Sequence, residues 1–307
     1  QAEDGIRDSV ASRGLGDVYK RQPLFIAATS AAKARVCAPL HTEDKQSLLT
    51  AHLRAADARV DERCTKTMQR ASSSLAVSTW FRLPEYMERL EILSRGSAFR
   101  LASGGVVASA HVLAPWRFPN YFPEEWVKSV GPEHTRYFLE RRSAAGVVEA
   151  CTEASSPVCH ADRDAAVLTP IDAAALDVLG APPLDLALGA LEDGAVLTVD
   201  GHNIEDAGED DDLVVPEIVA GAYAGRLAGG PQDFLRTDSR LEQGQCGAPV
   251  ILFGSACVGV VEGIVPVGHP LAGLAAFVPA AELADLVAAE AVPSDGPPPE
   301  SLAGLVV

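Results

Sequence analysis

One short segment constrains this 307-residue chain more than any other. Residues 237–250 read Thr-Asp-Ser-Arg-Leu-Glu-Gln-Gly-Gln-Cys-Gly-Ala-Pro-Val, which places the thiol of Cys246 beside Gly247 and two residues after Gly244. The apolar run that follows, residues 250–253, is typical of a buried strand. Glycines around a nucleophile allow the tight backbone that aims several N–H groups at one point, where an oxyanion can form. The segment therefore predicts a nucleophile turn that leads into a strand.

This segment resembles the nucleophile turn of the chymotrypsin-like peptidases, above all of their HtrA/Deg-like branch. That family carries the pattern Gly-x-Ser-Gly-Gly-Pro, led by Thr-Asp. Here Cys246 stands in the serine position and Ala248 in the position of the second glycine. The alternative interpretation is a chance cysteine in a Gly-rich turn.

Two further segments match the same family, in the order His, Asp, nucleophile that is typical of the chymotrypsin clan. Residues 104–113 contain His111 and are similar to the family's pattern small-x-x-Val-Leu-Thr-x-x-His-Val. The preceding Gly-Ser-Ala-Phe, residues 96–99, resembles the family's Gly-Ser-Gly-Phe strand. Residues 164–168 fit its Asp-x-Ala-x-Leu pattern. The resemblance covers roughly residues 72–290.

The resemblance implies a mainly β fold of two six-stranded antiparallel β-barrels. The first barrel, residues 71–178, would carry the histidine and the aspartate, and the second, residues 179–291, the nucleophile. Composition agrees, because 26 glycines and 21 prolines separate short apolar runs and favour many short strands. A short helix from Ala280 to Ala291 would close the second barrel, followed by a Pro-rich flexible tail at 292–307.

The amino-terminal part lies outside the resemblance. Residues 1–22 resemble translated adapter sequence, so we expect them to be non-native and leave them out of the fold. Because the chain begins with Gln, we expect the true start and any targeting signal to be missing. Residues 23–70 are expected to form a helical extension, since apolar residues recur every three to four positions across 46–70. This stripe would pack against the barrels; a coiled-coil seam is the alternative.

By the same resemblance, the chain would hydrolyse peptide bonds with a Cys-His-Asp triad and without a metal or other cofactor. Cys246 would attack the carbonyl, His111 would accept and return the proton, and Asp164 would orient the imidazole. The N–H groups of Gly244 and Cys246 would form the oxyanion hole. The alternative from another class is a catalytically inactive pseudoprotease that serves as a protein-binding scaffold. A site tuned for a serine oxygen often loses activity when sulfur replaces it.

Two opposite substrate preferences are compatible with the sequence. Arg240 stands six residues before the nucleophile, where trypsin-like pockets keep their specificity-determining residue. If it points into the pocket, acidic substrate side chains are favoured, whereas a differently bent loop would turn it to solvent. Glu262 and Gly263 lie on the strand expected to pair with the substrate backbone, where Glu262 would attract basic side chains instead. The two predictions conflict, and the sequence favours neither of them.

Charge and cysteine content limit the partners. Of the net charge of −17, the part from residue 143 onward holds 26 acidic and four basic residues, which disfavours nucleic acid as a partner. The acidic run at 205–212 lacks the ligand spacing of a calcium loop, and Cys151 and Cys159 with His160 lack zinc-site spacing. No apolar stretch reaches the roughly 18–20 residues of a membrane span, so we expect a soluble protein. Six cysteines without a secreted disulfide pattern favour an intracellular or organellar location over secretion.

Overall fold

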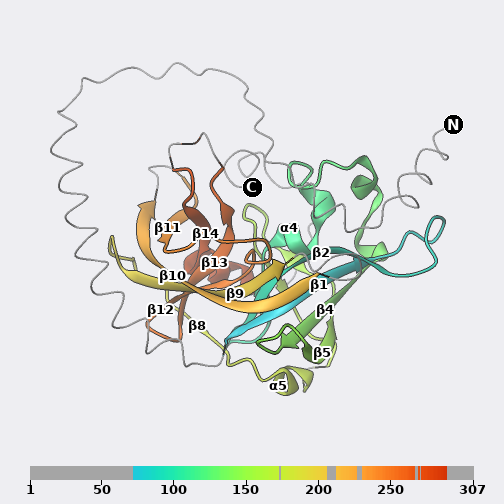
Figure 1. The fold of residues 1–307 in the computed structure, drawn as a ribbon, viewed down its shortest axis with the longest axis horizontal. Coiled ribbons are helices and arrows are strands. Elements are labelled where there is room, and N and C mark those ends of the chain that lie inside the picture. The colour runs from blue at the N-terminus through green and yellow to red at the C-terminus, as the bar shows by residue number, and fades with distance from the viewer. Residues whose placement is uncertain are drawn as a thin grey trace, which may run out of the picture. The chain divides into compact units, whose positions relative to one another are not determined.

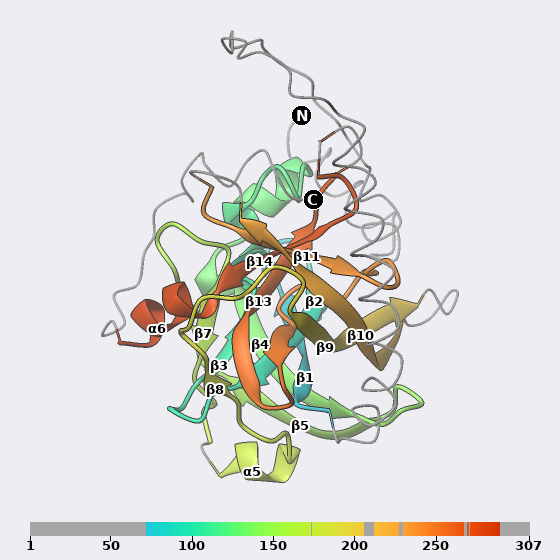
Figure 2. The ribbon, with the colours of Figure 1, turned by 90° about the vertical axis from the view of Figure 1, so that its left-hand side faces the viewer.

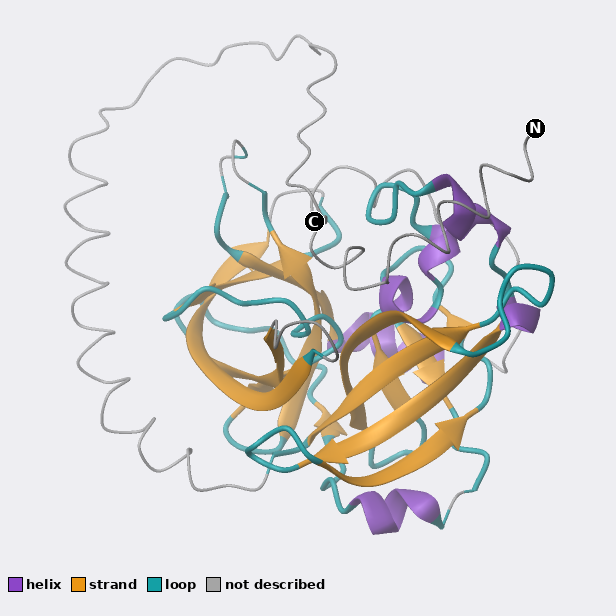
Figure 3. Ribbon diagram, turned by 45° about the vertical axis from the view of Figure 1, so that its right-hand side comes forward, coloured by secondary structure: helices purple, strands orange, loops and turns teal. Residues whose placement is uncertain are grey.

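The structure is a computed structural model that describes residues 72–172, 174–205, 212–226, 230–266, 269 and 271–288. These residues are mainly β, with short helices at the margins (Figure 3). The strands are β1 (Ser74–Phe81), β2 (Glu91–Arg100), β3 (Val106–Ala108), β4 (Thr135–Arg142), β5 (Val148–Ala154), β6 (Val158–Cys159), β7 (Ala166–Leu168), β8 (Asp185–Leu186), β9 (Val196–Glu205), β10 (Leu213–Arg226), β11 (Asp233–Thr237), β12 (Pro249–Leu252), β13 (Ala256–Ile264) and β14 (Ala275–Pro279). The helices are α4 (Ala110–Leu113), α5 (Ala175–Leu179), α6 (Ala280–Ala288) and the 3₁₀ turns η1 (Pro115–Arg117), η2 (Glu125–Ser129) and η3 (Pro132–His134).

The second half of the chain closes as a six-stranded antiparallel barrel (Figure 1). Its strands follow the order β12, β9, β10, β11, β14 and β13, and β13 then pairs with β12 to complete the ring. β8 adds to β13 in parallel, outside the ring. Fully buried side chains, including Leu197, Val250 and Phe277, fill the interior. Closure leaves these six strands without a free edge along most of their length.

The first half forms an open seven-stranded sheet in place of the expected six-stranded barrel. Its order is β5, β4, β1, β2, β3, β7 and β6. Within the described residues the edge strands β5 and β6 do not pair, and an isolated bridge joins Ala154, at the end of β5, to Pro170, which follows β7. Strand length explains the difference, because β6 and β7 have two and three residues and cannot continue a ladder with the seven-residue β5.

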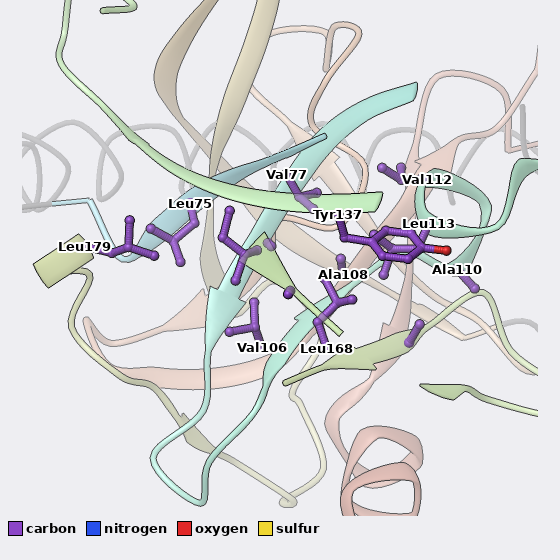
Figure 4. Close-up of a cluster of buried hydrophobic side chains, with 14 of the residues drawn as sticks. Leu75, Val77, Val106, Ala108, Ala110, Val112, Leu113, Tyr137, Leu168 and Leu179 are labelled. Atoms are coloured by element: carbon purple, nitrogen blue, oxygen red, sulfur yellow. The ribbon is translucent and has the colours of Figure 1, made fainter. Parts of the chain in front are cut away.

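The short helix α4 is anchored by the core of this sheet. The cluster gathers side chains from β1, β3, β4 and β7 together with Leu113 of α4, as Figure 4 shows. Val112 and Leu113 are 3% and 0% exposed, and Tyr137 of β4 is 1% exposed. A four-residue helix has little stability of its own, so this burial is what fixes the position of His111, which lies between Ala110 and Val112.

Two serine hydroxyls tie this sheet to the second half of the chain. The Ser97 hydroxyl donates to the Gly244 carbonyl at 2.7 Å, and the Ser97 N–H donates to the Cys246 carbonyl at 2.8 Å. The Ser109 hydroxyl donates to the Val261 carbonyl at 2.7 Å. Both serines are 0% exposed, so each hydroxyl satisfies a carbonyl that water cannot reach. The segment before His111 and the turn that holds Cys246 are thereby held in fixed register.

This junction requires a glycine at position 247. Gly247 has φ +88°, and a Cβ there would lie 3.0 Å from the Ser109 nitrogen and closer still to the Ser97 carbonyl oxygen. The positive φ disfavours any residue with a Cβ, and the short distances leave no room for one. A residue other than glycine would therefore have to displace a buried backbone segment. The glycine after the thiol therefore has a packing role as well as a conformational one.

The predicted closing helix lies within the described residues, whereas the predicted terminal segments do not. The closing helix is present as α6, which begins at Ala280 and lies beside β7 in Figure 2. The predictions for residues 1–22, for the extension at 23–70 and for the tail at 292–307 concern residues outside those that the structure describes. Within the described residues, no helix is both long and apolar enough to cross a membrane.

We expect Gly247→Ala to destabilise the protein by about 3–5 kcal/mol, because the substitution adds overpacking to a left-handed backbone. Gly104→Ala is the matched control, since Gly104 also has positive φ (+103°) but nothing lies within 4 Å of the added Cβ. The control should cost only about 1–2 kcal/mol. Urea unfolding of both variants measures the difference, and equal losses would contradict the packing role.

Candidate functional site

His111 and Asp164 are joined at two points. The Nδ1 atom of His111 lies 2.5 Å from Oδ2 of Asp164, and the backbone N–H of His111 donates to Oδ1 at 2.8 Å. Asp164 is 0% exposed and His111 is 6% exposed. The carboxylate therefore fixes both the backbone and the ring of the histidine. With Nδ1 engaged, Nε2 is the ring nitrogen left for chemistry.

Cys246 influences the pKa of the same imidazole. Burial opposes a charge on His111, but the Asp164 carboxylate and the Cys246 side chain, each as a charge and as a hydrogen-bonding partner, raise the pKa of His111 well above its usual value. The three residues that the sequence singled out as a triad are thus brought together. An imidazole with a raised pKa next to a thiol is suited to hold the proton that the thiol gives up.

The turn around Cys246 contains the two backbone N–H groups that would face an oxyanion, those of Gly244 and Cys246. Gly244 has φ +99°, and a Cβ there would lie 2.8 Å from the His202 carbonyl oxygen. The N–H of Gly247 donates to Val261 at 2.9 Å. Within the described part of the chain, by contrast, no acceptor receives the N–H of Gly244 or of Cys246. These are the two donors that the sequence assigned to an oxyanion hole.

Two aromatic side chains that the sequence did not single out enclose the imidazole. The Tyr121 ring stacks on His111, with centroids 4.8 Å apart and an interplanar angle of 5°. Phe118 meets both rings edge-on. The Tyr121 hydroxyl is buried and has no hydrogen-bond partner among the described residues. Burial, together with the nearby Asp164, Glu262 and Cys246, raises its pKa well above the usual value.

The proposed specificity residues lie in contrasting environments. Arg240 is exposed, which agrees with its solvent-facing alternative. Gly263 is buried on β13, where the register against β14 shifts between Val261 and Gly263. Glu262 is 1% exposed, so its carboxyl does not lie at a surface where it could attract a basic substrate side chain. That expectation for Glu262 does not fit the structure, because β13 is covered on both faces.

Four cysteines lie in the described residues, and all four are free. Cys151 is exposed, Cys159 is half-buried, and Cys257 is buried, where burial raises its pKa to about 12. Cys246 is half-buried and is the one of the four that contributes to the raised pKa of His111. Position rather than cysteine content therefore singles out Cys246 as the candidate nucleophile.

Comparison with known proteins gives similarity at the level of structure. No protein-family model matches this chain, and no curated protein matches it. The active form of Rv3671c protease from M. tuberculosis is similar over 74% of this chain and 86% of that one, with 19% identity and a TM-score of 0.44. Deg5 is similar over 73% and 92%, with 18% identity and a TM-score of 0.46. The serine endoprotease from Yersinia pestis is similar over 73% and 64%, with 17% identity and a TM-score of 0.46.

Asp164→Asn should lower the pKa of His111, because the variant loses the charge that raises it while burial continues to lower it. NMR titration of the imidazole carbon-bound protons measures this directly and requires no substrate. His202 is an internal reference, since burial lowers its pKa to about 3 and it should stay neutral in both proteins. A His111 titration that is the same in both proteins would contradict the assigned coupling.

Proposed function

We propose that this protein is an endopeptidase of trypsin-like fold that hydrolyses peptide bonds through Cys246, His111 and Asp164. The observation that supports the proposal most is the imidazole of His111, which is bound at Nδ1 by the buried Asp164 and whose pKa is also raised by Cys246. We assign residues 71–178 to the half that carries the base and residues 179–291 to the half that carries the nucleophile.

The reaction begins with proton transfer from the Cys246 thiol to His111. The raised pKa of His111 favours a thiolate–imidazolium pair, in which the sulfur is already ionised before attack. Attack on the peptide carbonyl forms a thioester, and His111 returns its proton to the departing amine. Water then attacks the thioester with His111 as the base, which releases the acid and restores the thiol.

The oxyanion that forms during each attack needs donors that are already in place. The N–H groups of Gly244 and Cys246 are free of acceptors in the described residues and belong to the same turn as the sulfur. Their carbonyl groups are held from the other side by the hydroxyl and the N–H of Ser97. Donors fixed in this way stabilise developing charge without reorganisation, which is the largest electrostatic contribution in acyl transfer.

A strand edge beside the turn supports binding of an extended substrate. The ladder between β12 and β13 ends with the pair Pro249 and Val260, and Val261 then bonds to Gly247 and Ala248. Beyond it, residues 262–264 have no strand on that side within the described chain. A peptide could add there by backbone hydrogen bonds, with its carbonyl led toward Cys246. We assign the backbone of Gly263 to this edge.

The alternative function is a pseudoprotease that binds proteins without cleaving them. It is favoured by the sulfur atom in a serine-type turn and by the Tyr121 ring stacked over His111. In that case the strand edge would serve as a peptide-binding site. Cleavage by the wild-type chain distinguishes the two functions.

Under reducing conditions, the full chain should cleave members of a proteome-derived peptide library, and Cys246→Ala should abolish this cleavage. Cys151→Ala is the matched control, because it removes an exposed thiol elsewhere in the same protein. Mass spectrometry of the products also gives the residue preference, and comparison with Arg240→Ala tests whether Arg240 selects acidic side chains. Silence of a folded wild-type chain would support the scaffold function instead.

Replacement of Asp164 should reduce activity less than replacement of His111. If the thiolate–imidazolium pair forms before attack, the aspartate only orients the ring, whereas the histidine holds the proton itself. We expect a loss of kcat/KM of about 10³-fold or more for His111→Ala and about ten times less for Asp164→Ala. Equal and near-complete losses would count against the ion pair.

A further inference from the structure

Glu262 occupies a β-bulge next to the candidate site. On β13, Val261 pairs with Phe277 and Gly263 pairs with Ala276, so Glu262 has no partner residue on β14. Val261 accepts hydrogen bonds from Ser109 and Gly247, which places the bulge against the junction of the two halves. Bulges next to active sites commonly re-aim a side chain. Here the re-aimed side chain is a carboxyl.

That carboxyl is buried and unpartnered. Glu262 is 1% exposed, and within the described residues neither of its oxygens has a hydrogen-bond partner. A buried carboxylate without donors is among the most costly groups in a protein interior. The neutral acid avoids most of that cost, since it carries no charge to be solvated.

A second carboxyl shares the site and is fully satisfied. Asp164 accepts hydrogen bonds from the N–H and the ring of His111, so its charge is compensated. Two buried carboxyl groups that interact cannot both ionise cheaply, and the proton resides on the one with fewer donors. Of this pair, Glu262 is the one with none.

The groups that face Glu262 come from several elements. Asp164 and Arg163 precede β7, His111 belongs to α4, Tyr121 follows η1, and Gln232 precedes β11. Burial is the largest influence and raises the pKa of Glu262 to about 8, with Asp164 acting in the same direction. The Gln232 amide, His111 and Arg163 offset only part of the increase. The amide nitrogen of Gln232 does not meet the carboxyl in hydrogen-bonding geometry.

We propose that Glu262 is a positioning residue that resides in the site as a neutral carboxylic acid, so that Asp164 is the single buried carboxylate acting on His111. The proposal deepens the proposed function and rests on it. When Glu262 ionises, a second carboxylate competes for the one imidazolium and raises the free energy of the neighbouring thiolate. Activity should therefore fall on the alkaline side as Glu262 ionises.

The test compares pH profiles of kcat/KM for the wild type, Glu262→Gln and Glu262→Ala. Glutamine keeps the shape and the neutrality of the acid, so its alkaline limb should move at least about one pH unit above that of the wild type. Alanine also lacks the ionisation but leaves a cavity, so its activity should be lower and glutamine should restore it. Glu88→Gln changes an exposed carboxyl and should keep the wild-type profile. An alkaline limb that is the same in Glu262→Gln and in the wild type would overturn the proposal.

A second measurement does not depend on catalysis. A pKa that is higher in the folded than in the unfolded chain gives stability that is complete below about pH 4.5 and is lost as the pH rises to about 8. In a Cys246→Ala background, the urea midpoint of Glu262→Gln should therefore rise relative to Glu262 between pH 5 and pH 8. A midpoint difference that does not change with pH would overturn the neutral acid, whether or not the protein cleaves peptides.

Discussion

The junction at Ser97, Ser109 and Gly247 is the constraint on which the rest of the site depends. Three backbone segments approach there so closely that a Cβ on the glycine would collide with two of them. The approach is stabilised because each serine hydroxyl donates to a carbonyl of the opposite half, where no water could do so. One of these carbonyls belongs to the nucleophile turn and the other to the strand that carries Glu262. The junction therefore fixes the positions of the Cys246 sulfur and the His111 imidazole relative to each other, although the two residues come from different halves of the chain.

At this junction, the two buried carboxyl groups, Asp164 and Glu262, differ in the number of hydrogen-bond donors that reach them. Asp164 receives two hydrogen bonds from one residue, and its carboxylate raises the pKa of His111. Glu262 lies in the same interior without donors, and burial raises its pKa instead. The two buried carboxyl groups thus differ in their donors, since Asp164 accepts from a backbone and a ring N–H and Glu262 from neither. Tyr121 completes the arrangement by covering the ring face, which keeps the surrounding dielectric low.

The sequence carried the parts of this site that depend on local backbone conformation. A thiol between glycines, a histidine after a short strand and an aspartate before another each leave a local pattern, and the three lie together in the structure. Contacts that form only through tertiary packing left no such pattern. Tyr121 lies ten residues beyond His111 in an irregular segment, with no periodicity to show that it folds back onto the ring. Glu262 resembles a polar residue at a strand edge, and only the packing of β13 between its neighbours shows that it is buried.

The bulge on β13 also has a consequence for how such a site can change over generations. A bulge is one extra residue in one strand, so its presence is a matter of chain length and not of residue type. Deleting the extra residue, Glu262, would restore regular pairing with β14 while Gly263 stays opposite Ala276. The acid would then be lost from the interior without any substitution. Lineages of this fold could therefore gain or lose an interior proton through insertions and deletions, which an inspection of matched residues alone would overlook.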